Sequence, residues 1–210
     1  MTAAENLTLE TADGVRIEAE LALPDDATAL LVMCHPHPQY GGSMDAGLVD
    51  ELFRSLPGRG LGVLRFNFRG VGASTGSFGG GVGERADVLA AVEVAAERAG
   101  GRFPVILGGW SFGADVSLTI DHPAAQGWVL VAAPLRITAA EDWVAPADDR
   151  PTLLLVPEHD QYRSPASAAE ATAEWRATRV ESLPGADHFV WGHASAIADH
   201  IVGFARSLAG

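Results

Sequence analysis

The chain has 210 residues, of which 48% are hydrophobic, and this is enough to bury one sizeable core, so we expect a single domain over residues 1–210. The formal net charge of −13 at pH 7 argues against binding to nucleic acid or to anionic membranes, whose phosphates would repel such a surface. No apolar run approaches the ~20 residues that span a bilayer, and the first residues lack the basic and apolar segments of a signal peptide, so the sequence predicts a cytoplasmic protein.

The first part of the chain predicts a hairpin followed by two strands with a helix between them. Residues 6–10 and 15–23 alternate apolar and polar side chains around a turn, as in an antiparallel hairpin with one solvated face. The continuous apolar run at residues 29–34 is typical of a strand that is buried on both faces, and residues 62–68 predict another strand. Residues 46–56, between these two strands, predict a helix.

Strands and helices continue to alternate to the end of the chain. We expect strands at residues 103–107, 127–132, 152–156 and 179–183, and helices at residues 84–98, 114–120, 166–178 and 194–208. This order predicts an α/β fold with an open, mainly parallel central sheet, an antiparallel N-terminal edge and helices on both faces. The connection at residues 134–150 is too short for a large cap domain. Ligands of such sheets bind outside the carboxyl ends of the strands.

The pentapeptide Gly109-Trp110-Ser111-Phe112-Gly113 lies between a predicted strand and a predicted helix. Glycines flank the serine because the chain turns too sharply there for bulky neighbours. The hydroxyl of Ser111 would project above the sheet, and the backbone N–H of Phe112 would point at whatever the serine attacks. In this strand–turn–helix context the pattern predicts that Ser111 is a nucleophile.

A serine hydroxyl attacks only when a base removes its proton and a third group orients that base. His188 follows the last predicted strand in a loop, where its ring can reach over the sheet, and we expect it to be the base. Asp160 directly follows the preceding predicted strand and is the expected acid, with Glu158 as the alternative. The resulting chain order of serine, acid and histidine is the order found in nucleophile-elbow hydrolases.

The second donor to an oxyanion should come from the loop that follows the strand at residues 29–34. Pro36 and Pro38 have no N–H, so only the residues between and after them can donate. We expect the backbone N–H of His37 to be the partner of the N–H of Phe112, with Gln39 or Tyr40 as alternatives.

Neither a metal nor a cofactor is expected. His35 and His37 form an H-x-H pair, but no third ligand stands at a telling spacing and prolines adjoin both histidines. Gly70 and Gly72 follow a strand, but no third glycine stands at the dinucleotide spacing, and the acidic residue that such a site requires is also missing. Cys34 is the one cysteine and there is no lysine, which excludes a multi-cysteine metal site and Schiff-base chemistry.

Five segments of the chain together resemble a known family. They are residues 35–45 (HPHPQYGGSMD), 65–76 (RFNFRGVGASTG), 109–113 (GWSFG), 158–160 (EHD) and 185–188 (GADH). In this order they are similar to the small, capless α/β-hydrolases related to dienelactone hydrolases and carboxylesterases, and the similarity extends from about residue 21 to the C-terminus.

The resemblance implies the α/β-hydrolase fold, with Ser111 as nucleophile, His188 as general base and then acid, and Asp160 as the acid that orients it. It also implies a structural loop at residues 65–76, in which Arg69 binds neighbouring carbonyls or carboxylates. One departure matters. Dienelactone hydrolases use a cysteine nucleophile where this chain has Ser111, and so dienelactone chemistry is not implied.

We therefore expect a cofactor-free serine hydrolase that cleaves carboxylic esters through an acyl-enzyme. A thioesterase, a peptidase or amidase, and a perhydrolase would use the same residues, and a non-catalytic binding protein on the same scaffold is the alternative from another class. Without a cap the site should be open, which favours a small or short-acyl ester as the partner molecule. An exposed edge strand or helix would allow a homodimer.

Large apolar residues cluster in the loops at the expected site. We expect an apolar substrate pocket there, lined by Tyr40, Trp110, Trp143 and Phe189. No arginine is clearly placed to bind a substrate carboxylate, although Arg136 and Arg163 fall in loops at strand ends.

Overall fold

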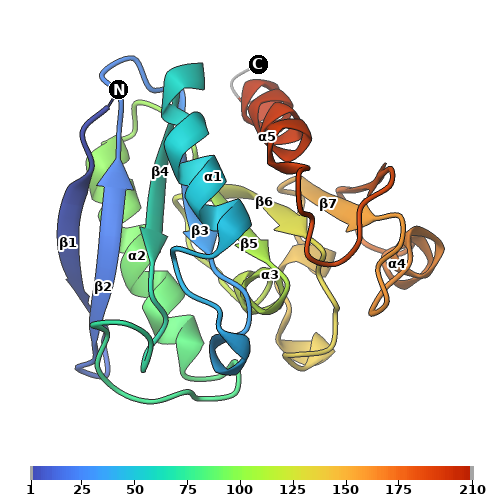
Figure 1. Ribbon diagram of the computed structural model, residues 1–210, viewed down its shortest axis with the longest axis horizontal. Coiled ribbons are helices and arrows are strands. Elements are labelled where there is room, and N and C mark those ends of the chain that lie inside the picture. Colours follow the sequence, from blue (N-terminus) through green and yellow to red (C-terminus); the bar gives the residue numbers. More distant parts are fainter. Residues whose placement is uncertain (1, 209–210) are drawn as a thin grey trace.

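A twisted sheet of eight strands runs through the protein, as the computed structural model shows for residues 2–208 (Figure 1). The strands are β1 (Glu5–Glu10), β2 (Arg16–Ala22), β3 (Ala29–Cys34), β4 (Leu61–Phe66), β5 (Val105–Trp110), β6 (Ala125–Val131), β7 (Thr152–Pro157) and β8 (Thr178–Leu183). Their order in the sheet is β1-β2-β4-β3-β5-β6-β7-β8. β2 is antiparallel to both β1 and β4, whereas β4, β3, β5, β6, β7 and β8 run parallel to one another. The predicted mainly parallel sheet with an antiparallel N-terminal edge is confirmed.

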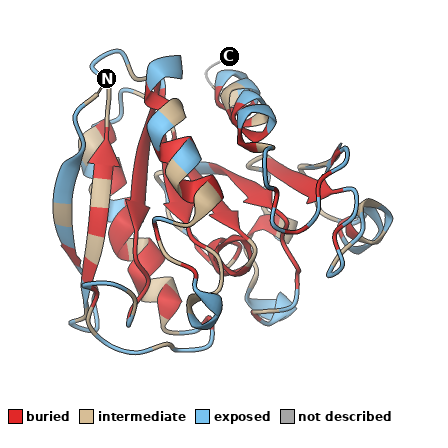
Figure 2. Ribbon diagram, in the orientation of Figure 1, coloured by how far each residue is buried: buried red, intermediate tan, exposed pale blue. Residues whose placement is uncertain are grey.

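Helices cover both faces of the sheet, also as predicted (Figure 1). α1 (Gly47–Ser55) and α5 (Ala194–Leu208) pack on one face, and α2 (Glu84–Ala99), α3 (Phe112–Ser117) and α4 (Pro165–Ala171) pack on the other. The apolar side chains of β3, β4, β5 and β7 are buried along the whole strand, because each strand lies between two helical layers (Figure 2). The edge strands β1 and β8 keep exposed positions.

Several predicted elements have different bounds in the structure, among them β5 and α4. β5 continues to Trp110, beyond the predicted end at residue 107, because its last residues pair with both neighbouring strands. The helix predicted at residues 166–178 ends at Ala171, where the hydroxyl of Thr172 donates a hydrogen bond back to the carbonyl of Ala168. The following residues turn so that Trp175 packs against Trp143 and β8 can pair with β7.

Only short 3-10 turns occupy the connection between β6 and β7: η3 (Ala140–Asp142) and η4 (Ala145–Ala147). Two further turns of this kind, η1 (Pro38–Tyr40) and η2 (Pro57–Arg59), flank α1. The chain thus has no cap over the carboxyl ends of the strands within residues 2–208, in agreement with the prediction. None of the helices in the same range combines the length and the hydrophobicity that a membrane span requires.

Arg69 joins the loop after β4 to two other parts of the fold. Its guanidinium donates to the fully buried carboxylate of Asp87 on α2, with the shortest distance at 2.7 Å, and to Asp13 in the β1–β2 turn at 2.8 Å. The backbone N–H of Arg69 also donates to Asp87 at 2.9 Å. Arg69 therefore binds carboxylates, as the resemblance implied, and these bonds connect the loop after β4 to α2 and to the β1–β2 turn.

Candidate active site

Ser111 lies in a tight turn between β5 and α3, at the carboxyl edge of the parallel strands. Its backbone φ of 54° is in the left-handed region, where a residue with a side chain is strained. A Cβ on Gly109 would lie 2.4 Å from the N of Ala114, and one on Gly113 would lie 2.6 Å from the carbonyl oxygens of Cys34 and His35. Glycine at both positions therefore lets the strand, the helix and the loop after β3 approach one another closely.

The structure brings together the three residues that the sequence singled out. The hydroxyl of Ser111 donates to Nε2 of His188 at 2.9 Å, and Nδ1–H of His188 donates to Oδ2 of Asp160 at 2.8 Å. A carboxylate can only accept, so the hydrogen of the neutral ring is on Nδ1 and Nε2 is free to take a proton from the serine. The side chains of His188 and Asp160 are buried, whereas Ser111 is partly exposed.

Neighbouring groups hold the histidine and the acid in place. The indole N–H of Trp110 donates to the carbonyl of His188 at 3.1 Å. Oδ1 of Asp160 accepts the backbone N–H of Tyr162 at 2.8 Å, which turns the other carboxylate oxygen toward the ring. Glu158, the alternative acid, is exposed and accepts the N–H of Gly185 at 2.7 Å instead.

The backbone N–H groups of Phe112 and His37, the predicted oxyanion donors, have no hydrogen-bond acceptor among residues 2–208. The two alternatives to His37 are engaged locally. The N–H of Gln39 donates to Nδ1 of His37 at 3.2 Å, and the N–H of Tyr40 donates to the carbonyl of His37 at 3.0 Å. Both N–H groups are therefore available to an acceptor, and their role as the oxyanion pair stays a prediction.

His35 has a different position from His37, although only a proline separates them. Its ring is fully buried; Nδ1–H donates to the carbonyl of Pro36 at 2.6 Å, and Nε2 accepts the backbone N–H of Phe68 at 3.0 Å. Burial disfavours the charged ring and lowers the pKa of His35 from 6.5 to about 4. This residue therefore fastens the loop after β3 to the loop after β4.

We expect the neutral state of His35 to make stability depend on pH. Below pH 6.5 the unfolded chain binds a proton on this ring, whereas the folded protein does not until about pH 4, so stability is lost as the pH falls through this window. Relative to His35→Gln, which keeps an acceptor for the N–H of Phe68, the wild type should lose about 2 kcal/mol of unfolding free energy between pH 7 and pH 5. Urea unfolding of both proteins at the two pH values measures this difference. Equal losses of unfolding free energy in the wild type and in His35→Gln would contradict the lowered pKa of His35.

A cavity of about 670 Å³ opens directly onto Ser111 and His188. Of the four residues predicted to line it, Tyr40, Trp110 and Phe189 do so. The prediction for Trp143 is wrong. Its indole N–H donates to the hydroxyl of Thr138 at 2.8 Å, and its ring packs on Trp175, because the short turns after β6 fold the residue back onto the core.

Arg136, Tyr162 and Trp191 are among the further residues that line this cavity, and the first two were not predicted to do so. The ring of Tyr162 lies edge-on to that of His188, with the centroids 4.5 Å apart. In the sequence, only its position two residues after Asp160 indicated that Tyr162 would lie at the cavity. The glycine-rich residues 76–83 do not line the cavity, and the buried carboxylate of Glu84 accepts the N–H groups of Gly79 and Gly81 from this segment.

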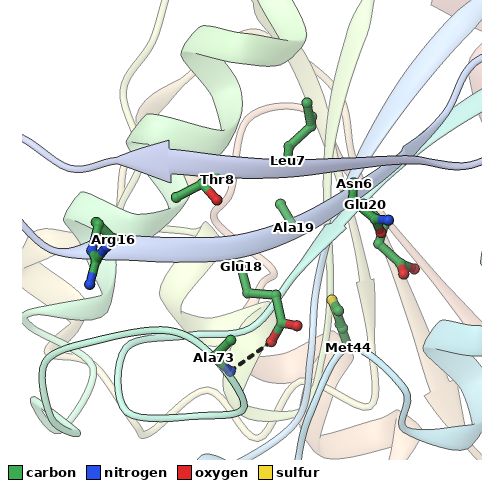
Figure 3. A pocket seen from close by; sticks show the side chains of 9 residues that line it. All are labelled: Asn6, Leu7, Thr8, Arg16, Glu18, Ala19, Glu20, Met44 and Ala73. Atoms are coloured by element: carbon green, nitrogen blue, oxygen red, sulfur yellow. Dashed lines mark hydrogen bonds between the residues drawn. The ribbon is translucent and has the colours of Figure 1, made fainter.

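A smaller depression of about 310 Å³ lies over β1, β2 and the loop that carries Ala73 (Figure 3). Its two carboxylates are already engaged. Glu18 accepts the N–H of Ala73 at 2.8 Å and the amide of Asn67 at 2.7 Å, and Glu20 pairs with Arg65. These hydrogen bonds connect the N-terminal hairpin to β4 and to the loop that follows it.

Comparison with known proteins agrees with this geometry. The profile of the family Hydrolase_4, described as serine aminopeptidase, S33, matches residues 25–149, a segment that includes Ser111. An uncharacterized protein of Rickettsia prowazekii (strain Madrid E) is 34% identical over 124 residues, which are 58% of this chain and 52% of that protein. The match therefore spans about half the length of this curated relative.

Several solved structures superimpose on nearly the whole chain. An alpha-beta serine hydrolase homologue from Coxiella burnetii is 27% identical, with a TM-score of 0.82 and 97% of each chain covered. The protein XC6422 from Xanthomonas campestris, an α/β serine hydrolase without a lid, is 28% identical, with a TM-score of 0.83 and coverage of 99% of this chain and 95% of that chain. The esterase Pf2001 of Pyrococcus furiosus shares the fold at 14% identity, with a TM-score of 0.81 and coverage of 100% and 94%.

Proposed function

The chain belongs to the Hydrolase_4 family of α/β serine hydrolases, and from this premise we propose that it hydrolyses small carboxylic esters through a covalent acyl-enzyme. The observation that carries the proposal is the continuous chain of hydrogen bonds from Ser111 through His188 to Asp160, at 2.9 and 2.8 Å. The cavity at Ser111 leaves room for a small acyl substrate, and the proposal needs no metal and no cofactor.

In the first half of the reaction, the Ser111 oxygen attacks the ester carbonyl while Nε2 of His188 takes its proton. The carbonyl oxygen becomes negatively charged and accepts hydrogen bonds from the N–H groups of Phe112 and His37. The carboxylate of Asp160 stabilises the imidazolium of His188, which then gives its proton to the leaving alcohol. The product of this half is an ester between the acyl group and Ser111.

In the second half, His188 takes a proton from a water molecule as the water attacks the acyl-enzyme. The second tetrahedral intermediate uses the same two N–H donors. His188 returns its proton to the Ser111 oxygen, which releases the carboxylic acid and restores the starting state.

The description of the family suggests a different substrate, the amino terminus of a peptide. The lining of the cavity favours an ester instead. An aminopeptidase must bind a protonated amine, which calls for a carboxylate in the pocket. No aspartate or glutamate of residues 2–208 lines this cavity. The esterase Pf2001 shares the fold at 14% identity, so the argument for an ester rests on the site rather than on this protein.

We expect turnover of p-nitrophenyl esters to fall as the acyl chain lengthens from acetate to decanoate. In a site without a cap, the outer part of a long acyl chain stays in water and gains little from burial. Steady-state kinetics over this series measure kcat/KM for each ester. An increase toward decanoate would contradict the short-acyl specificity, and no turnover of any ester by the folded protein would contradict ester hydrolysis itself.

A further inference from the structure

Among the described residues that line the cavity of Ser111, Arg136 is the only arginine, aspartate or glutamate. The chain has 27 aspartates and glutamates, yet within residues 2–208 none of them faces this cavity. The described lining of this cavity in a strongly acidic protein thus carries a single permanent charge, and that charge is positive. Such a cation attracts an anionic group of a bound molecule.

The guanidinium of Arg136 has no carboxylate partner among the described residues, unlike the arginines that serve the fold, such as Arg69 and Arg150. The side chain of Arg136 is exposed, and it lies over the ring of Tyr162 with 5.0 Å between Cζ and the ring centroid. The ring of Tyr162 in turn contacts that of His188. The free cation is therefore one aromatic ring away from the proposed base.

The backbone that carries Arg136 is held rigidly. The fully buried carboxylate of Asp115, on α3, accepts the N–H groups of Leu135, Arg136 and Ile137 at 2.9, 2.7 and 2.8 Å. Leu135 has a φ of 52°, a strained conformation that these hydrogen bonds maintain.

From the other side of the same segment, Arg163 donates to the carbonyl of Pro134 at 3.0 Å. Because α3 begins directly after Ser111, the position of Arg136 is fixed relative to the nucleophile. The backbone at Arg136 therefore loses little conformational freedom when a substrate binds.

We propose that Arg136 binds a carboxylate of the substrate, so that the preferred esters are those that carry a free carboxylate a few carbons from the ester bond. This inference rests on the proposed function, because it assigns the substrate class of the same site. The planar guanidinium matches a carboxylate with two parallel hydrogen bonds. A single arginine balances the one negative charge of a carboxylate, whereas a phosphate monoester would keep an unbalanced charge inside an acidic protein.

The test compares ethyl esters that differ only in charge. Monoethyl glutarate carries the carboxylate, and the ethyl ester of glutaramic acid replaces it with a neutral amide of nearly the same shape. A third compound, the acetate ester 4-acetoxybutyrate, carries the carboxylate on the alcohol part of the ester, whereas monoethyl glutarate carries it on the acyl part. The one with the higher kcat/KM shows on which part of the ester Arg136 binds the carboxylate. Proton release in a pH-stat gives kcat/KM for each ester.

The wild type should prefer the charged ester, and Arg136→Gln should lower the ratio of kcat/KM for charged and neutral esters by about 10- to 100-fold. Arg206→Gln, in the last turn of α5, removes the same charge far from the cavity and should leave the ratio unchanged. An unchanged ratio in Arg136→Gln, or an equal fall in Arg206→Gln, would overturn the proposal.

A binding measurement separates this inference from the proposed function. Calorimetric titration of Ser111→Ala with monoethyl glutarate needs no turnover, and adding Arg136→Gln to this variant should weaken binding by a similar factor. If the protein turns over no ester but Arg136→Gln still weakens this binding, the carboxylate site stands and ester hydrolysis fails. If neutral esters are hydrolysed and Arg136→Gln changes neither the ratio nor the binding, ester hydrolysis stands and the carboxylate site fails.

Discussion

Ser111→Ala should lower kcat for p-nitrophenyl acetate by about 10⁶-fold, to the level that binding and the two N–H donors provide without a nucleophile. Within residues 2–208, the Ser111 oxygen is the only group at hydrogen-bond distance from Nε2 of His188, so no other described side chain is placed to take over the attack. The substitution removes one oxygen from a partly exposed side chain and should leave the fold intact. Steady-state kinetics and the circular dichroism spectrum of the variant measure the two effects.

The control for this variant is Ser207→Ala, which removes a hydroxyl that only caps the carbonyl of Phe204 on α5. It should keep full activity. A fluorophosphonate probe, which reacts only with an activated serine, should label the wild type and Ser207→Ala but not Ser111→Ala. Turnover retained by folded Ser111→Ala would falsify the proposed mechanism, and a wild type that the probe does not label would favour a non-catalytic binding protein.

Asp160→Asn should lower kcat by about 10⁴-fold, less than the loss of the serine. An asparagine amide can donate to Nδ1 of His188, which would move the ring hydrogen to Nε2 and leave no acceptor for the proton of Ser111. Its oxygen can still accept the N–H of Tyr162, so the loop should keep its conformation. Kinetics with the same ester give the loss, and thermal unfolding tests the fold.

Glu158→Gln is the matched control, because Glu158 is a neighbouring carboxylate in the same loop that binds only the N–H of Gly185. We expect a change of no more than a few-fold in kcat from this substitution, since a glutamine oxygen can accept the same hydrogen bond. If Glu158→Gln costs as much as Asp160→Asn, or if Asp160→Asn is fully active, Asp160 is not the group that orients His188.

Because no cap covers the cavity within residues 2–208, we expect the exposed side chains at its rim to contact the substrate directly. Tyr40, Tyr162, Phe189 and Trp191 are among the few large hydrophobic side chains that are exposed in this protein, and all four line the cavity. Exposed apolar side chains that gather in one place usually mark a binding site. Together with Arg136, they give the cavity an apolar rim and one cationic group, which suits a small ester with a carboxylate at one end.

The sequence by itself determined the order and type of the elements and the residues that carry the proposed chemistry. Alternating apolar runs and helical segments predicted the parallel sheet, because strand and helix periodicities are local properties of a chain. Glycines at 109 and 113 predicted the turn at Ser111 for the same reason. Asp160 and His188 could be found because the carboxyl ends of parallel strands meet at one edge, so residues directly after strands lie close together.

The tertiary structure decided which loop side chains reach the cavity. Trp143 and Arg136 come from the same connection after β6, yet Trp143 packs against Trp175 and Arg136 faces the cavity. The buried carboxylate of Asp115 causes this difference, because it binds the backbone N–H groups of residues 135–137. Asp115 lies 20 or more residues before them in the sequence. Likewise, Gln39 and Tyr40 use their N–H groups within their own turn, which leaves His37 free. Such choices depend on contacts between distant segments, and no local pattern of residues encodes them.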